Sequence, residues 1–390
     1  AWSKVANMLY LEAPIGVGYS YSEEPGDIKH LNDEQTAEDN LQALKAFFAL
    51  FPEFKHLDFY VSGESYAGVY VPTLSLKIFC DSSVDWNMKG FIVGNGVMDY
   101  TIMKQTSIPF LYGHGAISER KMAELNSLCH GDLTSRSFRC HGAVSQAETK
   151  AMQAVNVWDF YRDCFSNSSA NATKFVPLLT ARHVAQRPDL LRTLIQAPRP
   201  PHPALQMKGN VPCIDTVGGT AYLNRDEVRK ALHIKDFLPP WTICADIGYF
   251  INNSFSAPPL YNIMKDKYKI LVYNGDTDVS CNYIMGSRSV DAVGAWIERD
   301  KDWVAWTVSK ATGVQAAGWL TAYQTGPGMY FLTAKGAGHL VPQWKPQESL
   351  EMLRRFLADE DMQHGGPKQG GNVTPASKTS RNSGPSSIVV

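Results

Sequence analysis

The fold is decided by a twelve-residue stretch, Leu57-Asp58-Phe59-Tyr60-Val61-Ser62-Gly63-Glu64-Ser65-Tyr66-Ala67-Gly68. Its first five residues form a short apolar run typical of a strand, and a helix is expected from about Tyr66. Between them the small residue Gly63 permits a sharp, strained turn on which the Ser65 hydroxyl projects above the sheet edge. The stretch therefore predicts a nucleophilic serine between a strand and a helix. The alternative is a glycine turn with a bystander serine.

Strands and helices alternate on both sides of this turn. The apolar run at 7–12 predicts a buried strand, and a helix capped by Asn32 continues until Pro52. Further strands are predicted at 91–93, 269–273 and 329–332, with a hairpin of 303–308 and 319–323 between the last two. This alternation predicts an α/β protein with a mostly parallel sheet and helices on both faces.

Residues 101–215 interrupt the alternation. Polar and basic segments dominate there, and four prolines fall between Pro198 and Pro203, so we expect an inserted cap region. Residues 1–100 and 216–360 are then the first and second parts of the core, which ends in an amphipathic helix over 346–357. Residues 361–390 are rich in Gly, Pro, Ser and Lys and are predicted to be a disordered tail.

Composition excludes several classes of protein. The net charge is -1, from 37 basic and 38 acidic residues, so no nucleic-acid partner is expected. No run of about eighteen apolar residues suggests a membrane span. Seven cysteines without a C-x-x-C pair argue against a metal site. Together with Asn-x-Ser/Thr glycosylation acceptors, they favour a secretory or lysosomal setting over a cytosolic enzyme with buried thiols. These acceptors are Asn167, Asn171, Asn252 and, less clearly, Asn372.

A nucleophilic serine on this turn requires an acid and then a histidine, each on a loop at the carboxyl end of a later strand. After the strand at 269–273 only His339 and His364 remain, and His364 falls in the polar stretch beyond the final helix. His339 is therefore the candidate, with a surface-loop histidine as the alternative. For the acid, Asp276 and Asp278 both follow the strand at 269–273, and spacing does not separate them.

Four ordered motifs resemble those of the serine carboxypeptidase family, in particular its lysosomal cathepsin A type. They are Leu9-Tyr10-Leu11-Glu12-Ala13-Pro14-Ile15-Gly16-Val17-Gly18-Tyr19-Ser20-Tyr21-Ser22, Gly63-Glu64-Ser65-Tyr66-Ala67-Gly68, Asn274-Gly275-Asp276-Thr277-Asp278 and Gly336-Ala337-Gly338-His339-Leu340-Val341-Pro342. The resemblance spans nearly everything from Val5 to Leu357. It implies an α/β-hydrolase fold, release of C-terminal residues from peptides and no cofactor. It also selects Asp278, the second Asp of the Gly-Asp-x-Asp loop, as the triad acid with Ser65 and His339.

The resemblance extends to the surroundings of the serine. Glu64 resembles the acid that binds the substrate's terminal carboxylate, which requires a shared proton and implies activity at acid pH. The alternative is an acid favoured by the dipole at a helix N-terminus. The backbone N–H of Tyr66 is expected to form half of the oxyanion hole. Cys281 resembles a free thiol that lines the pocket for the residue before the scissile bond.

In the family the second oxyanion donor lies in a Trp-x-Asn-Gly-Gly-Pro-Gly-Cys-Ser-Ser segment, which this sequence lacks. Early strands of the fold are also expected to be missing. Because loss of one donor costs ~10²–10³ in rate, we expect this chain alone to be inactive or unfolded. The resemblance implies the disulfides Cys164–Cys213 and Cys129–Cys140. It would pair Cys244 with the cysteine of the absent segment and leaves Cys80 without an identified partner.

Two rival functions stay open. The same triad serves esterases, acyltransferases and hydroxynitrile lyases. Cathepsin A-like proteins also bind and protect lysosomal hydrolases, so a non-catalytic scaffold is the second rival. The resemblance implies peptides with a free C-terminal carboxylate as substrates and a lysosomal or secreted location, and it allows a homodimer and lysosomal hydrolase partners. The Gly16-x-Gly18 pair lacks the rest of a dinucleotide motif, so no nucleotide cofactor is expected.

Overall fold

The computed structural model describes residues 1–24, 26–29, 31–164, 211, 213–245, 247–367 and 385–390. The chain divides into two compact units. Unit 1 consists of Ala1–Leu11, Asp33–Met103 and Ser254–Val390, and unit 2 of Glu12–Asn32 and Lys104–Asn253. Unit 2 is thus larger than the cap expected at 101–215, because Glu12 and Leu31 contact residues beyond that range: Trp241 donates to Glu12, and Leu31 pairs with Tyr249.

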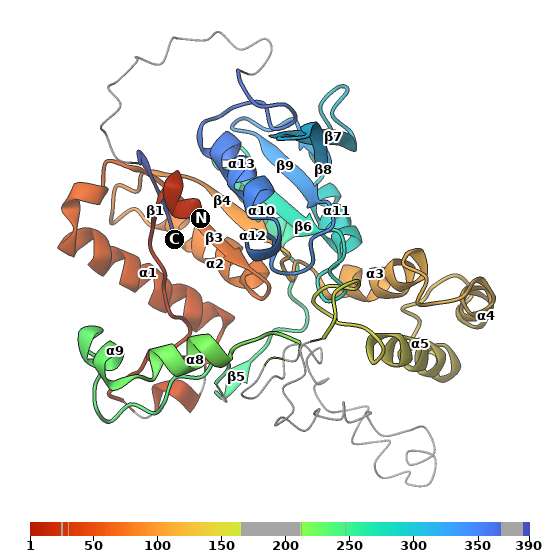
Figure 1. Cartoon of the computed structure of the whole chain (residues 1–390), viewed down its shortest axis with the longest axis horizontal. Helices are drawn as coiled ribbons and strands as arrows, with labels where there is room; N and C mark the ends of the chain where they lie inside the picture. The colour runs from red at the N-terminus through yellow and green to blue at the C-terminus, as the bar shows by residue number, and fades with distance from the viewer. Residues whose placement is uncertain (25, 30, 165–210, 212, 246, 368–384) are drawn as a thin grey trace. The chain divides into compact units, whose positions relative to one another are not determined.

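Unit 1 is built on an eight-stranded sheet (Figure 1). In spatial order its strands are β1 (Asn7–Met8), β10 (Ser387–Val389), β3 (Asp58–Glu64), β4 (Met88–Gly94), β6 (Lys269–Gly275), β9 (Met329–Ala334), β8 (Gly313–Tyr323) and β7 (Val304–Lys310). The pairs from β1 to β9 are parallel, whereas β9–β8 and β8–β7 are antiparallel. The predicted mostly parallel sheet and the hairpin at one side of it are confirmed.

Helices pack on both faces of this sheet. On one face Phe356 of α13 contacts Tyr60 of β3, with ring centroids 5.7 Å apart, and on the other Phe48 of α1 contacts Phe59 at 5.6 Å. Because successive strand residues point to opposite faces, these two contacts place α13 and α1 on opposite sides. The helices of unit 1 are η1 (Trp2–Lys4), α1 (Asp33–Leu50), η3 (Pro52–Phe54), α2 (Ala67–Cys80), α10 (Pro258–Met264), α11 (Tyr283–Asp291), α12 (Val341–Trp344) and α13 (Pro346–Leu357).

The central strands are buried along their whole length. Every residue of β6 and of β9 is buried, and five consecutive residues at the carboxyl end of β4 are buried as well. Strands covered by helices on both faces are mostly apolar at successive positions, so their sequences show near-continuous apolar runs rather than alternation. The parallel arrangement brings the carboxyl ends of β3, β4, β6 and β9 to one edge of the sheet.

Two parts of the sheet differ from the prediction. The strand expected at 7–12 covers only Asn7–Met8, and Tyr10 beyond it is 82% exposed. The disordered tail expected at 361–390 is wrong for Ser387–Val389, which form β10 between β1 and β3 with Ile388 and Val389 buried. The apolar, β-branched run Ile388-Val389-Val390 favours a strand, although low-complexity residues precede it. Residues 368–384 lie outside the described residues.

Unit 2 is mainly helical. Its elements are η2 (Asp27–Lys29), β2 (Leu31–Asn32), most of α3 (Tyr100–Gly113), α4 (Glu119–Cys129), α5 (Phe138–Met152), α8 (Val217–Leu223), α9 (Asp226–Ala231) and β5 (Tyr249–Phe250), which pairs in parallel with β2. The disulfides Cys129–Cys140 and Cys164–Cys213 are formed as predicted. Of the predicted glycosylation acceptors, Asn252 is exposed, whereas Asn167, Asn171 and Asn372 lie outside the described residues.

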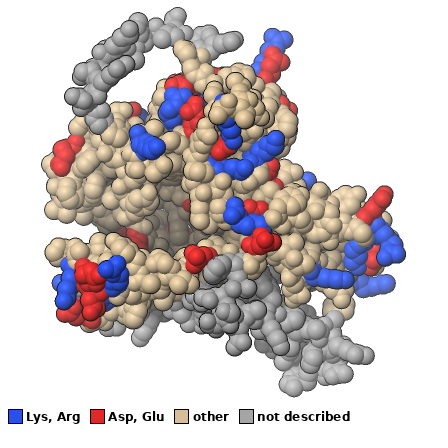
Figure 2. Space-filling model, viewed as in Figure 1, with Lys and Arg blue, Asp and Glu red and all other residues tan. Residues whose placement is uncertain are grey.

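Surface charge is mixed in sign. Acidic and basic side chains are interspersed with uncharged residues over the visible face (Figure 2). In the part of the chain that the structure describes, no helix combines the length and the apolar character needed to cross a membrane.

Candidate active site

Ser65 lies where β3 ends and α2 begins, in a left-handed backbone conformation with φ of 65°. This conformation is unfavourable for a residue other than glycine, so neighbouring hydrogen bonds must hold it. The Ser65 N–H donates to the carbonyl of Gly94 at 3.1 Å, and its carbonyl accepts from Gly68 and Val97, both at 2.9 Å. The predicted strand, strained serine and helix are therefore present.

The two glycines that flank the turn are required by close packing. A Cβ atom at Gly63 would lie 2.4 Å from the Cβ of Ala67, and one at Gly68 would lie 2.5 Å from backbone atoms of Val97. Both distances are too short for two carbon atoms, or a carbon and a backbone atom, that are not bonded to each other. The tight strand-to-helix turn thus explains why small residues stand on both sides of Ser65.

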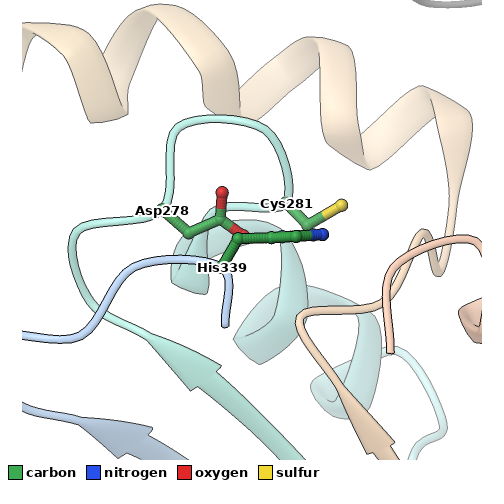
Figure 3. Close-up of side chains that lie close together, drawn as sticks. All are labelled: Asp278, Cys281 and His339. Carbon is green, nitrogen blue, oxygen red and sulfur yellow. The ribbon is translucent and has the colours of Figure 1, made fainter. Parts of the chain in front are cut away.

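Asp278 and His339 are brought together from loops that follow β6 and β9 (Figure 3). The Nδ1 atom of His339 lies 2.7 Å from Oδ2 of Asp278, and both side chains are buried. A buried carboxylate next to Nδ1 fixes the tautomer and ring orientation of the imidazole. Asp276, the other candidate acid, instead accepts a hydrogen bond from the backbone N–H of Gly336 at 2.6 Å. Of the two aspartates, Asp278 is therefore the one that contacts the histidine.

A buried asparagine that sequence reasoning missed holds the aspartate. Asn95 Nδ2 donates to Asp278 Oδ2 at 2.8 Å, and Asn95 Oδ1 accepts from the backbone N–H of Gly275 at 3.1 Å. The N–H of Ser280 donates to the other oxygen, Oδ1, of Asp278 at 2.9 Å. Asn95 directly follows β4 and therefore lies at the carboxyl edge of the sheet. This position in the sequence is the signal that could have indicated a role for Asn95 in the site.

The charges of the site shift two pKa values. Burial raises the pKa of the Glu64 carboxyl to about 7, while the nearby His339 lowers it and Asp278 raises it further. Burial alone lowers the pKa of the His339 imidazole, but the charge and hydrogen bond of Asp278 raise it overall. Both His339 and Asp278 shift the pKa of Glu64, so Glu64, the residue before Ser65, lies close enough to interact electrostatically with both.

Cys281 lies beside the pair and is buried. Its thiol pKa is raised well above the ordinary value by burial and by Asp278, so the thiol is protonated. Ligand-type atoms of Asp278, Cys281 and His339 lie within 4.8 Å of one another. However, Oδ2 and Nδ1 at 2.7 Å are closer than two zinc ligands, which tetrahedral geometry separates by roughly 3.3 Å. The aspartate and the histidine thus have the geometry of a hydrogen bond.

Tyr66 occupies the N-terminal cap position of α2, directly after the strained serine. Its backbone N–H is thus one of the amides at the N-terminus of α2, the end of a helix that favours anions. Its hydroxyl donates to Oδ1 of Asp33 at 2.9 Å, a contact that the sequence did not predict. The oxyanion role of the Tyr66 amide, like the other catalytic roles, stays a prediction.

The chain is similar in sequence to proteins of one family and similar in structure to a solved protein. The family described as serine carboxypeptidase matches residues 1–359. The chain is 34% identical to serine carboxypeptidase ctsa-4.1 of Caenorhabditis elegans, covering 93% of this chain and 76% of that protein. It is 32% identical to the lysosomal protective protein of Mus musculus, covering 92% and 76%. The solved structure of the Saccharomyces cerevisiae prohormone-processing carboxypeptidase KEX1(delta)p is similar, with a TM-score of 0.57, 17% identity and coverage of 89% and 73%.

Proposed function

Because the chain belongs to the serine carboxypeptidase family, we propose that it hydrolyses the C-terminal peptide bond with Ser65 as nucleophile, His339 as base and Asp278 as the triad acid. The observation that carries this proposal is the buried Asp278–His339 hydrogen bond of 2.7 Å. It is supported by the strained backbone of Ser65, which follows a strand of the same parallel sheet. It is also supported by Glu64, the residue before Ser65, whose pKa is shifted by both His339 and Asp278.

The proposed reaction uses a covalent intermediate. Ser65 Oγ attacks the carbonyl carbon of the last peptide bond while its proton passes to Nε2 of His339. Asp278 stabilises the imidazolium, and the Tyr66 N–H donates to the oxyanion of the tetrahedral intermediate. His339 then gives the proton to the departing amine, which leaves as the free C-terminal amino acid. Water, activated by the same imidazole, hydrolyses the Ser65 ester and restores the enzyme.

Glu64 is the proposed determinant of carboxypeptidase specificity. With a pKa of about 7 its carboxyl is protonated in mildly acidic solution and can donate a hydrogen bond to the substrate's terminal carboxylate. Above that pH the two carboxylates repel each other and substrate binding weakens. His339 sets the opposite limit, since its raised pKa keeps it protonated and unable to act as a base in acid. We therefore propose that acid pH favours substrate binding. At the lowest pH values of this range, protonation of His339 lowers the rate.

The Tyr66 amide is the one oxyanion donor assigned among the described residues. Turnover depends on every oxyanion donor, because the loss of one costs ~10²–10³ in rate. Tests of the site therefore use fluorophosphonate labelling, which reports the reactivity of a serine nucleophile without requiring repeated turnover.

Location and partners follow from the relatives. Similarity to a lysosomal protective protein and to plant serine carboxypeptidases supports a lysosomal or secreted location, where the two disulfides would persist. The word "protective" in the name of the mouse protein favours one second function, the binding of partner hydrolases in the lysosome. A homodimer is a further proposal, and size-exclusion chromatography with light scattering would test it.

The function is tested with matched peptides that differ only at the C-terminus. We expect release of the last residue from a peptide with a free carboxylate and at least ~10-fold slower cleavage of the same peptide as its amide, because Glu64 has no carboxylate to bind. Mass spectrometry of the products at pH 5–6 measures this. Equal rates on the two peptides would contradict the carboxypeptidase proposal and favour an esterase or acyltransferase on the same fold.

A further inference from the structure

A carboxylate on α1 contacts the residue next to the nucleophile. The hydroxyl of Tyr66 donates to Oδ1 of Asp33 at 2.9 Å, in a partly buried position. The two residues are 33 positions apart, and Asp33 is the first residue of α1, whereas Tyr66 caps α2. The contact thus connects the Ser65 turn to a separate helix.

Helix α1 is itself fixed against α2. The ammonium of Lys77 on α2 pairs with Glu34 at 2.5 Å and with Glu38 at 3.2 Å, both on α1. Apolar side chains of α1, among them Leu41 and Leu44, are buried. Asp33 therefore projects from a helix end whose position is set by independent contacts.

The ring of Tyr66 is held on two sides. It makes an edge contact with the ring of Tyr70, one turn along α2, at a centroid distance of 4.9 Å. Burial, Asp33 and the nearby Tyr100 raise the pKa of Tyr66 far above its ordinary value, so its hydroxyl stays a hydrogen-bond donor at all physiological pH values. One contact to the hydroxyl and one to the ring therefore hold the side chain.

Fixing this side chain constrains the backbone beside Ser65. The carbonyl of Tyr66 accepts from Val69 at 2.8 Å, and Ser65 before it has the unfavourable φ of 65°. A strained turn persists only when its surroundings determine it. We propose that Asp33 is a positioning residue that, through the Tyr66 hydroxyl, aims the Tyr66 amide at the reaction's oxyanion. This inference rests on the proposed function of Ser65 and Tyr66.

The test compares variants on the two sides of the contact. Asp33→Ala removes the acceptor, and Tyr66→Phe removes the donor while keeping the ring and the backbone N–H. Each is expected to lower the rate of fluorophosphonate labelling of Ser65 by about 10-fold, since small displacements of catalytic groups cost this much or more. The double variant should be no slower than the slower single variant, because both remove the same contact. On any peptide that the protein cleaves, kcat should fall and KM should stay within about 2-fold.

Two further variants separate positioning from a loss of folding or of charge. Asp33→Asn keeps an oxygen acceptor for the Tyr66 hydroxyl and is expected to retain labelling within about 3-fold of the unmodified protein. Asp39→Asn removes a charge elsewhere on α1, where Asp39 accepts from Gln35 of the same helix at 2.8 Å, and should label at the unmodified rate. If Asp33→Ala does not fold, Tyr66→Phe, which loses a single oxygen atom, still decides the question.

Labelling of Asp33→Ala and Tyr66→Phe at the unmodified rate would overturn the positioning proposal, as would strictly multiplicative losses in the double variant. These outcomes are distinct from failure of the proposed function. If Ser65 of the unmodified protein is labelled but no peptide loses its last residue, the carboxypeptidase function fails and the labelling comparison still tests Asp33. If Ser65 is not labelled at all, both proposals are wrong.

Discussion

Asn95 Nδ2 lies 2.8 Å from Asp278 Oδ2, although the two residues are 183 positions apart in the chain. The same oxygen faces Nδ1 of His339 at 2.7 Å. Asn95 has a left-handed φ of 42°, a conformation that asparagine tolerates better than most residues, and is buried. A carboxylate held by an amide on one side and an imidazole on the other is fixed in place before any substrate binds.

Asn95→Ala is expected to lower Ser65 labelling by about 10- to 100-fold, because loss of one hydrogen bond to a charged group costs about 1.5–3 kcal/mol. Stopped-flow or gel-based labelling kinetics would measure this. Asn87→Ala is the matched control, since Asn87 likewise donates to a carboxylate, that of Asp58 at 3.3 Å, yet precedes β4 rather than following it. Equal labelling by the two variants would show that Asn95 does not orient Asp278.

The two aspartates of the loop after β6 can be distinguished directly. Asp278→Asn should reduce labelling by about 10³–10⁴-fold, because the imidazole loses the partner that sets its tautomer. Asp276→Asn removes a carboxylate two residues away that accepts from Gly336 N–H, so only a loss of about 10-fold or less is expected. A larger effect of Asp276→Asn would show that the geometric assignment of the acid is wrong.

Labelling should also depend on pH through His339. The pKa of His339 is raised above its ordinary value of 6.5, so the neutral base is lost as the pH falls through that raised value. The labelling rate is therefore expected to rise with pH across the neutral range and then level off, which a series of buffers at constant ionic strength would measure. A rate that does not change between pH 5 and 8 would exclude His339 as the base.

Sequence patterns predicted the framework of the site better than its internal contacts. Continuous apolar runs located β6 and β9, and turn chemistry located Ser65, because these signals are local. Pairing of Asn95 with Asp278 depends on two parallel strands lying side by side, which no local pattern specifies. The choice between Asp276 and Asp278 likewise needed either a family resemblance or the structure, since both follow the same strand.

Two strands, β1 and β10, differ from the sequence prediction for a physical reason. Tyr10 belongs to an apolar run but lies past the end of β1, so apolar character alone did not fix the strand's length. Ile388 and Val389 are buried between β1 and β3, yet they follow a polar, glycine-rich segment whose composition dominated the prediction. Burial of a short strand depends on its neighbours in the sheet, which lie far away in sequence.

Substrate affinity should respond to pH through Glu64. Ionisation above a pKa of about 7 places a negative charge against the substrate carboxylate, so KM for a free peptide should rise roughly 10-fold per pH unit beyond it. In Glu64→Gln, which keeps a donor but does not ionise, KM should stay constant from pH 5 to 8. Steady-state kinetics measure this, with the amidated peptide as the control substrate. A pH-dependent KM in Glu64→Gln would contradict the assignment.

The pH dependence of the free energy of unfolding provides an independent check on the raised pKa of Glu64. Its folded pKa of about 7 exceeds the ordinary 4.5, so its neutral form stabilises the fold below pH 4.5, and that contribution is lost as pH rises through 7. The loss is about 3 kcal/mol. Glu64→Gln should therefore gain stability relative to the unmodified protein between pH 5 and 8, as measured by urea unfolding. Glu53→Gln at an exposed position is the control, and equal behaviour of both variants would contradict the raised pKa of Glu64.

The most direct test of Ser65 as the nucleophile is the site of fluorophosphonate attachment, mapped by peptide mass spectrometry. We predict one adduct, on Ser65, formed by the unmodified protein and abolished in Ser65→Ala, with a loss of about 10³-fold or more in His339→Ala. Labelling of a different serine, or an adduct on Ser65 that forms equally fast in His339→Ala, would contradict it.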